Sequence, residues 1–97
     1  MNPVADSARI IVTVPNRLGL HARPAMLFAE RAQGHKADVR VQRADNDEQI
    51  DGKSIMHLMM LAATKGTKLI IEASGDDAAE AVASLQALVE SGFTEDE

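Results

Sequence analysis

Apolar residues recur every second position in some segments and every third or fourth position in others, and these segments follow one another along the chain. The first spacing predicts strands and the second predicts helices. Alternation of apolar and polar residues, with many β-branched side chains, predicts strands at residues 9–14, 37–43 and 68–74. A turn rich in Asp and Asn at residues 45–47 precedes a fourth, short strand at 49–51. The half-buried strands indicate a sheet that buries one of its faces.

Three further segments have the spacing of amphipathic helices. Residues 22–33 place apolar side chains three and four positions apart. Ser54 is suited to cap a second helix that runs from residue 55 to about 64. The third helix is expected at 78–91, with the turn at 75–77 as its N-terminal cap. The resulting order, β-α-β-β-α-β-α, predicts an open sheet with its helices packed on one side.

Length and composition narrow the class of protein. The 97 residues suffice for one hydrophobic core, so we expect a single domain over residues 1–97. Its core is expected at about 8–93, between a short N-terminal arm and an acidic tail at 94–97. Cysteine is absent, which excludes disulfides, thiolate nucleophiles and metal sites built on Cys. Neither a secretory signal nor a run of membrane-spanning length is found, so the expected location is the cytoplasm.

The formal net charge of −5 argues against a general nucleic-acid-binding protein. The charge is unevenly distributed along the chain. Residues 1–43 contain seven basic and three acidic residues, whereas residues 44–97 contain three basic and twelve acidic ones. The first part of the chain is therefore expected to give the surface a locally basic region.

The most distinctive segment, Gly-Leu-His-Ala-Arg-Pro-Ala at residues 19–25, lies where a loop enters the first predicted helix. Pro24 suits the first turn of a helix, which places His21 at or next to the N-cap. The free N–H groups and dipole of a helix start attract anions, and the Arg23 guanidinium matches phosphate oxygens. The segment lacks acidic and hydroxyl side chains, so the imidazole suits a phosphohistidine better than a general base. Judged by these residues alone, an ordinary polar helix start remains the commoner interpretation.

Two motifs resemble those of a known family. The segment 19–25 resembles the active-site signature of HPr, the histidine-containing phosphocarrier of the bacterial phosphoenolpyruvate-dependent phosphotransferase system. The segment Lys-Ser-Ile-Met at 53–56, with the apolar residues that follow it up to Leu61, resembles the second motif of that family. The resemblance covers about residues 8–93, with a residue or two extra around 45–48. It implies an α+β fold, an open-faced β-sandwich in which a four-stranded antiparallel sheet carries three helices on one face.

The resemblance also implies a function. Enzyme I, itself phosphorylated by phosphoenolpyruvate, would transfer a phosphoryl group to Nδ1 of His21, where Arg23 would help to hold it. His21 would then donate this group to an enzyme IIA component in sugar uptake or its regulation. Such a protein is a carrier, not an enzyme, and it needs no metal ion or cofactor. We expect a monomer that does not insert into membranes.

The second helix has an expected role in docking and in regulation. Ser54 matches the serine that HPr kinase/phosphorylase modifies in part of the family, and a phosphate there would lie favourably at a helix N-terminus. The helix is too apolar to bury every side chain, so we expect Leu58, Leu61 and Ala62 to be buried and others to remain exposed. His57 and the loop residue His35 are expected to be exposed. The residues expected to contact partners are Arg17, Leu20, Pro24, Ile55, Met56 and Met59.

Four alternatives differ in chemistry. A regulatory or nitrogen-branch protein would use the same relay with different partners, or act mainly by protein–protein binding. A binding module without phosphoryl transfer is opposed by the presence of His21, Arg23 and Pro24. A small phosphatase on a similar sheet would need a catalytic acid or amide beside an arginine. An acyl carrier would be mostly helical, which the strands at 9–14 and 68–74 oppose.

Overall fold

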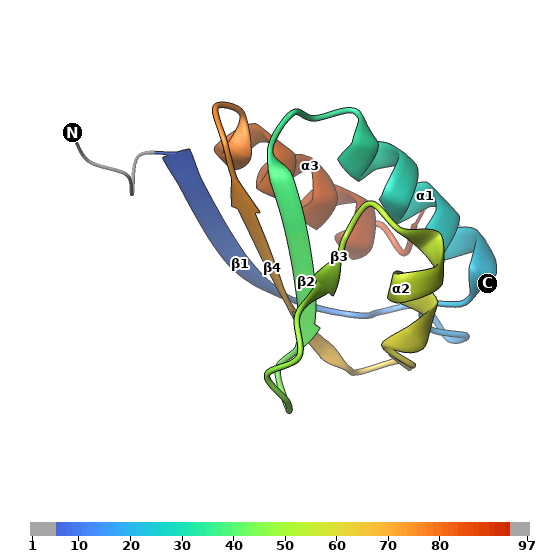
Figure 1. Ribbon diagram of the computed structural model, residues 1–97. Coiled ribbons are helices and arrows are strands. Elements are labelled where there is room, and N and C mark those ends of the chain that lie inside the picture. The colour runs from blue at the N-terminus through green and yellow to red at the C-terminus, as the bar shows by residue number, and fades with distance from the viewer. Residues whose placement is uncertain (1–5, 94–97) are drawn as a thin grey trace.

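The computed structural model describes residues 6–93 and contains the predicted elements in the predicted order (Figure 1). The acidic tail at 94–97 and most of the N-terminal arm lie outside the described residues. The strands are β1 (Ser7–Thr13), β2 (Asp38–Arg43), β3 (Ile50–Asp51) and β4 (Lys68–Ser74). The helices are α1 (Ala22–Gln33), α2 (Ile55–Met60) and α3 (Ala78–Glu90). All bounds lie within two residues of the prediction, except the end of α2.

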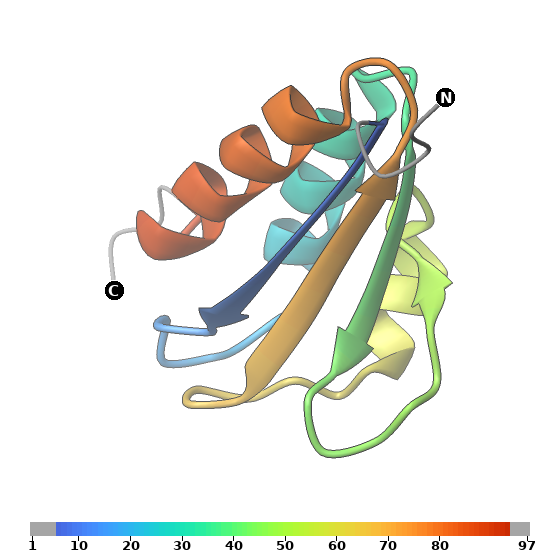
Figure 2. The ribbon, with the colours of Figure 1, turned by 90° about the vertical axis from the view of Figure 1, so that its left-hand side faces the viewer.

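The four strands form one antiparallel sheet in the order β1-β4-β2-β3. β4 is paired along its length with β1 on one side and with β2 on the other. Figure 2 shows the sheet in front, with α1 and α2 behind it. The other face is open, which explains why Ile11 is 61% exposed while its neighbour Val12 is 3% exposed. The predicted open-faced sandwich with three helices on one face is confirmed.

The core lies between this sheet and the helices. Alternate residues of β4 are buried, among them Leu69 and Ile71, as expected for a strand with one covered face. Phe28 of α1, Leu58 of α2 and Leu85 of α3 are buried in the same cluster. Burial of a large apolar side chain contributes about 1.5–3 kcal/mol, so each helix is held to the sheet chiefly by its apolar stripe.

Helix α2 ends four residues earlier than predicted. The chain leaves it through Ala62, whose φ of 53° lies in the left-handed region. Ala62 is therefore exposed, contrary to the prediction, and the following Ala63 is buried in its place. Arg43 at the end of β2 donates hydrogen bonds from Nη1 to the carbonyl oxygens of Leu61 (3.0 Å) and Ala62 (3.1 Å). These bonds satisfy carbonyl groups that the helix end leaves without intrahelical donors.

The start of α3 differs from its predicted capping. Asp77 occupies the N-cap, but its side chain does not cap the helix. The carboxylate instead accepts hydrogen bonds from the backbone N–H groups of Lys36 (2.9 Å) and Ala37 (2.8 Å), in the connection between α1 and β2. His35 lies 3.4 Å from the same carboxylate and is half-buried, so the prediction of a solvated loop residue was wrong. Asp77 thus joins two parts of the fold that are distant in sequence.

Candidate functional site

His21 occupies the N-cap position of α1, as predicted. Its backbone is extended, with φ −81° and ψ −170°, and its carbonyl accepts the first helical hydrogen bond, from Ala25 N–H at 2.9 Å. The imidazole does not act as the capping acceptor. The residue as a whole is half-buried, and its Nε2 atom is buried. Burial of this atom disfavours it as the point of attack for a reagent from solvent.

The start of α1 provides a positive electrostatic environment. The N–H groups of Ala22 and Arg23 precede the first helical hydrogen bond, and Pro24 has no N–H to satisfy. The first turn of α1 contains no acidic side chain that would offset the positive end of the helix dipole. The side chain of Arg23 is exposed, two residues after His21. This arrangement favours an anion next to the imidazole.

The loop before His21 is fixed by contacts that the sequence pattern did not predict. Asn16 is 6% exposed, and its side-chain amide donates to the Gly19 carbonyl at 2.7 Å. The N–H of Gly19 donates back to the carbonyl of Asn16 at 3.1 Å, and Leu20 N–H donates to the carbonyl of Ala63 at 2.8 Å. A Cβ atom on Gly19 would lie 2.4 Å from that same carbonyl oxygen. The turn-forming residues 15–19 predicted a loop. They did not predict that this loop packs against the segment after α2.

Two of the residues predicted to contact partners are in the core. Leu20 is 5% exposed, and Pro24 is among the fully buried side chains. Both pack inward because the loop folds onto the end of α2 and because α1 presents Pro24 to the core. Their burial leaves them little surface to offer a partner, so the structure does not support the prediction that they belong to the docking surface. Arg17 is exposed, as such a role requires.

Ser54 caps α2 as predicted. Its hydroxyl oxygen accepts a hydrogen bond from the backbone N–H of His57 at 3.2 Å, and the residue is half-exposed. Gln33, the last residue of α1, donates from its side-chain amide to the carbonyl of Lys53 at 2.9 Å. The start of α2 thus lies beside the end of α1. Since Leu20 is bonded to the segment after α2, the two helices run in opposite directions, and His21 lies towards the C-terminal end of α2.

The outer side of α2 exposes large apolar side chains. Ile55 is 38% exposed, Met56 74%, Met59 45% and Met60 72%, and we refer to these four residues as the α2 apolar surface. Leu58 is fully buried beneath it, as predicted. The exposure expected for Ile55, Met56, Met59 and His57 is present. Leu18 and Met26 are also exposed apolar residues near the start of α1, which the sequence pattern did not predict.

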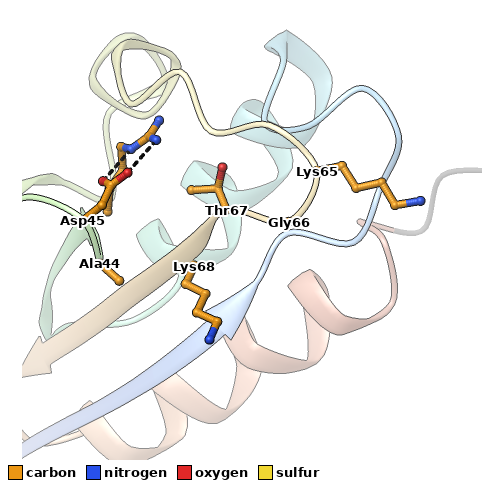
Figure 3. Close-up of a pocket in the computed structure, with 7 residues that line it drawn as sticks. Ala44, Asp45, Lys65, Gly66, Thr67 and Lys68 are labelled. Carbon is orange, nitrogen blue, oxygen red and sulfur yellow. Dashed lines mark hydrogen bonds and ion pairs between the residues drawn. The ribbon is translucent and has the colours of Figure 1, made fainter.

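The hollow drawn in Figure 3 lies apart from these residues. It has a volume of about 460 Å³ and is lined by residues 43–45 and 65–68. Two hydrogen bonds from Arg43 to Asp45, both 2.9 Å long, lower the pKa of the Asp45 carboxyl and raise that of Arg43. Lys65 and Lys68 point away from this pair (Figure 3), so the charges do not converge on a ligand position. Residues 6–93 also contain no cluster of three His, Asp or Glu side chains that suits a metal ion.

Comparisons with known proteins agree with the motifs. Residues 8–91 match the family model described as PTS HPr component phosphorylation site. The phosphocarrier protein HPr of Neisseria meningitidis serogroup A is 45% identical over 86 residues, which cover 89% of this chain and 94% of that protein. The phosphocarrier protein NPr of Escherichia coli K12 is 42% identical over 85 residues, covering 88% of this chain and 93% of that protein.

Solved structures agree as well. The crystal structure of HPr-C-His from Thermoanaerobacter tengcongensis superposes with a TM-score of 0.86 at 34% sequence identity, covering 93% of this chain and 99% of that one. HPr from Bacillus anthracis gives a TM-score of 0.79 at 36% identity and covers 86% and 96% of the two chains. The sequence matches and the structural superpositions therefore both extend over most of the chain. This chain belongs to the HPr family, whose members are phosphocarrier proteins of the phosphotransferase system and not catalysts.

Proposed function

We propose that this protein accepts a phosphoryl group from enzyme I on Nδ1 of His21 and donates it to enzyme IIA proteins. The observation that carries the proposal is the position of His21 at the N-cap of α1, with Nε2 buried. In the transfer, the Nδ1 lone pair forms a bond to phosphorus while the bond between phosphorus and the donor breaks. The reverse exchange on a second protein releases the group, and no cofactor takes part.

The helix start stabilises the phosphoryl group without trapping it. The N–H groups of Ala22 and Arg23 and the Arg23 guanidinium are the donors that its oxygens would meet. A helix terminus contributes about 0.3–1 kcal/mol to an exposed anion and about 2 kcal/mol when the site is partly buried. A contribution of about 1–2 kcal/mol shifts the transfer equilibrium towards the phosphorylated protein by about fivefold to thirtyfold. A shift of this size still allows an enzyme IIA protein to accept the phosphoryl group.

The α2 apolar surface is the proposed docking site for both partners. This surface lies on the helix beside α1. The segment that follows α2 is joined to the loop before His21 by the hydrogen bond from Leu20 N–H to the Ala63 carbonyl. Flexible methionine side chains adapt to partners of different shape, which suits a carrier that meets a donor and several acceptors in turn. The exposed guanidinium groups of Arg17 and Arg23 would attract acidic partners to the edge of this surface.

Ser54 is the proposed site of regulation by an HPr kinase/phosphorylase. The residue is half-exposed, and its oxygen already faces the N–H of His57. A phosphate at this position would lie at the start of α2, so it adds negative charge beside the α2 apolar surface without unfolding the helix. Regulation would then act through partner docking.

The relatives include phosphocarriers of two kinds, named HPr and NPr. The HPr of Neisseria meningitidis and the NPr of Escherichia coli are similarly close, at 45% and 42% identity. We propose that the chain acts in the cytoplasm as a monomer, in sugar uptake or its regulation, with a nitrogen-branch regulatory role as the second candidate. Measuring which enzyme IIA component receives the phosphoryl group from the phosphorylated protein decides between them.

The test of the acceptor uses purified protein, enzyme I and labelled phosphoenolpyruvate. The parent protein should acquire label that is labile in acid and stable in alkali, and His21→Ala should acquire none. His35→Ala is the matched control, because it removes an imidazole at the far end of α1 and should be labelled like the parent. Label on His21→Ala, or alkali-labile label on the parent, would refute the assignment of His21.

A further inference from the structure

Four methionine side chains are exposed on neighbouring helices. Met56 and Met60 of α2 are 74% and 72% exposed, Met59 is 45% exposed, and Met26 of α1 is 41% exposed. Methionine is among the residues most often buried in folded proteins, so this degree of exposure is unusual. Helices α1 and α2 are in contact, and Figure 1 shows them side by side.

Helix α2 alone holds three of the five methionines of the chain, Met56, Met59 and Met60. The sequence contains five methionines and no Cys, Trp or Tyr, and the fifth methionine is Met1, outside the described residues. A small oxidant therefore has no thiol or indole with which to react first. The sulfur atoms of the two most exposed methionines, Met56 and Met60, are the most accessible targets that residues 6–93 offer.

We propose that Met56 and Met60 form a site of reversible oxidation by peroxides, and that their oxidation weakens partner docking. In the forward step one oxygen atom passes from hydrogen peroxide to the thioether sulfur. The O–O bond breaks, an S–O bond forms, the sulfur loses two electrons and water is released. In the reverse step a methionine sulfoxide reductase removes that oxygen as water, while two thiols are oxidised to a disulfide.

The consequence for docking rests on the function proposed above. A sulfoxide converts an apolar side chain into a polar one, and its oxygen must lose bound water when a partner covers the α2 apolar surface. The expected effect is a loss of about tenfold in the rate of phosphoryl transfer at low protein concentration. The fold should be unaffected, because Leu58 holds α2 to the core and the two methionines point away from it.

The experiment treats the protein with dilute hydrogen peroxide and maps the oxidised peptides by mass spectrometry. Met56 and Met60 should be oxidised before Met59 and Met26. The rate of phosphoryl transfer from enzyme I is then measured for treated and untreated samples, and again after treatment with methionine sulfoxide reductases and a thiol. Oxidation should lower the rate about tenfold, and reduction should restore it.

The variant Met56→Leu/Met60→Leu serves as the comparison, because leucine is apolar and cannot form a sulfoxide. Each protein is compared with its own untreated sample, so the basal rate of the variant does not enter the result. A treated variant that retains its own rate supports the inference. A parent that transfers normally after oxidation at both sites, or a variant that loses as much rate as the parent, overturns it. An untreated parent that accepts no phosphoryl group refutes the proposed function itself, and the docking consequence with it.

Discussion

Gly19 is the position at which the fold and the proposed site depend most directly on one another. Its φ of 72° lies in the left-handed region, and a Cβ atom there would lie 2.4 Å from the carbonyl oxygen of Ala63 and 2.8 Å from Cα of Thr64. Both atoms belong to the backbone, so they cannot move aside as a side chain would. Gly19→Ala must therefore displace the loop from the segment after α2.

The cost of this substitution has two parts. Placing alanine in the left-handed region costs about 1–2 kcal/mol. Separating the two segments also weakens the hydrogen bond from Leu20 N–H to the Ala63 carbonyl, which is 2.8 Å long, and loss of such a bond costs about 0.5–1.5 kcal/mol. The expected loss is about 1.5–3.5 kcal/mol, which lowers Tm by roughly 6 °C or more in a domain of this size.

The matched control is Gly92→Ala. Gly92 has nearly the same φ, 73°, but apart from its chain neighbours no atom of residues 6–93 lies within 4 Å of the position of its Cβ, so only the conformational cost of about 1–2 kcal/mol applies. Urea unfolding of the parent and both variants measures the difference. Gly19→Ala should be the less stable variant by about 1 kcal/mol, and it should also accept the phosphoryl group more slowly, because the preceding loop positions His21. Equal losses of stability in the two variants would show that the close approach of the Ala63 and Thr64 backbone to Gly19 is not what destabilises Gly19→Ala.

Three further predictions concern other contacts. Ser54→Ala removes the acceptor for His57 N–H and should lower the free energy of unfolding by about 1 kcal/mol, and an unchanged urea midpoint would contradict this. Arg43→Met should lower the urea midpoint more than Asp45→Asn, because only the former removes the donors to the carbonyls after α2; equal midpoints would speak against that role. The Lys36 N–H lowers the pKa of Asp77 below its ordinary value of 3.8, as does that of Ala37. The stability that this provides is complete above pH 3.8 and is lost as the pH falls through the lowered pKa, so acid titration should destabilise the parent more steeply than Asp77→Asn.

Periodicity was sufficient to predict most of the fold. The bounds of α1 and β4 are those predicted, because each is a continuous amphipathic segment ended by a turn. The end of α2 was not predictable in this way, since alanine at position 62 is a good helix former. Its left-handed conformation follows from contacts with Arg43 and with the loop before His21, which are distant in sequence. Local propensity contains no information about such contacts.

The candidate site was predicted only in part, again because some of its contacts join residues that are distant in sequence. A histidine and an arginine around a helix-starting proline were enough to place His21 at the N-cap and Arg23 on the surface. The packing of Leu20 and the buried amide of Asn16 depend on how the loop folds against the segment after α2. Motif spacing therefore predicts which residues surround His21, but not which of them face a partner.

Identifying the atom that carries the phosphoryl group tests the role of His21 directly. The protein is isotopically labelled with ¹⁵N, phosphorylated with enzyme I and phosphoenolpyruvate, and examined by NMR for phosphorus–nitrogen coupling in the histidine rings. We expect coupling at Nδ1 of His21 alone, because Nε2 is buried. Coupling at Nε2 of His21, or at His35 or His57, would contradict this expectation.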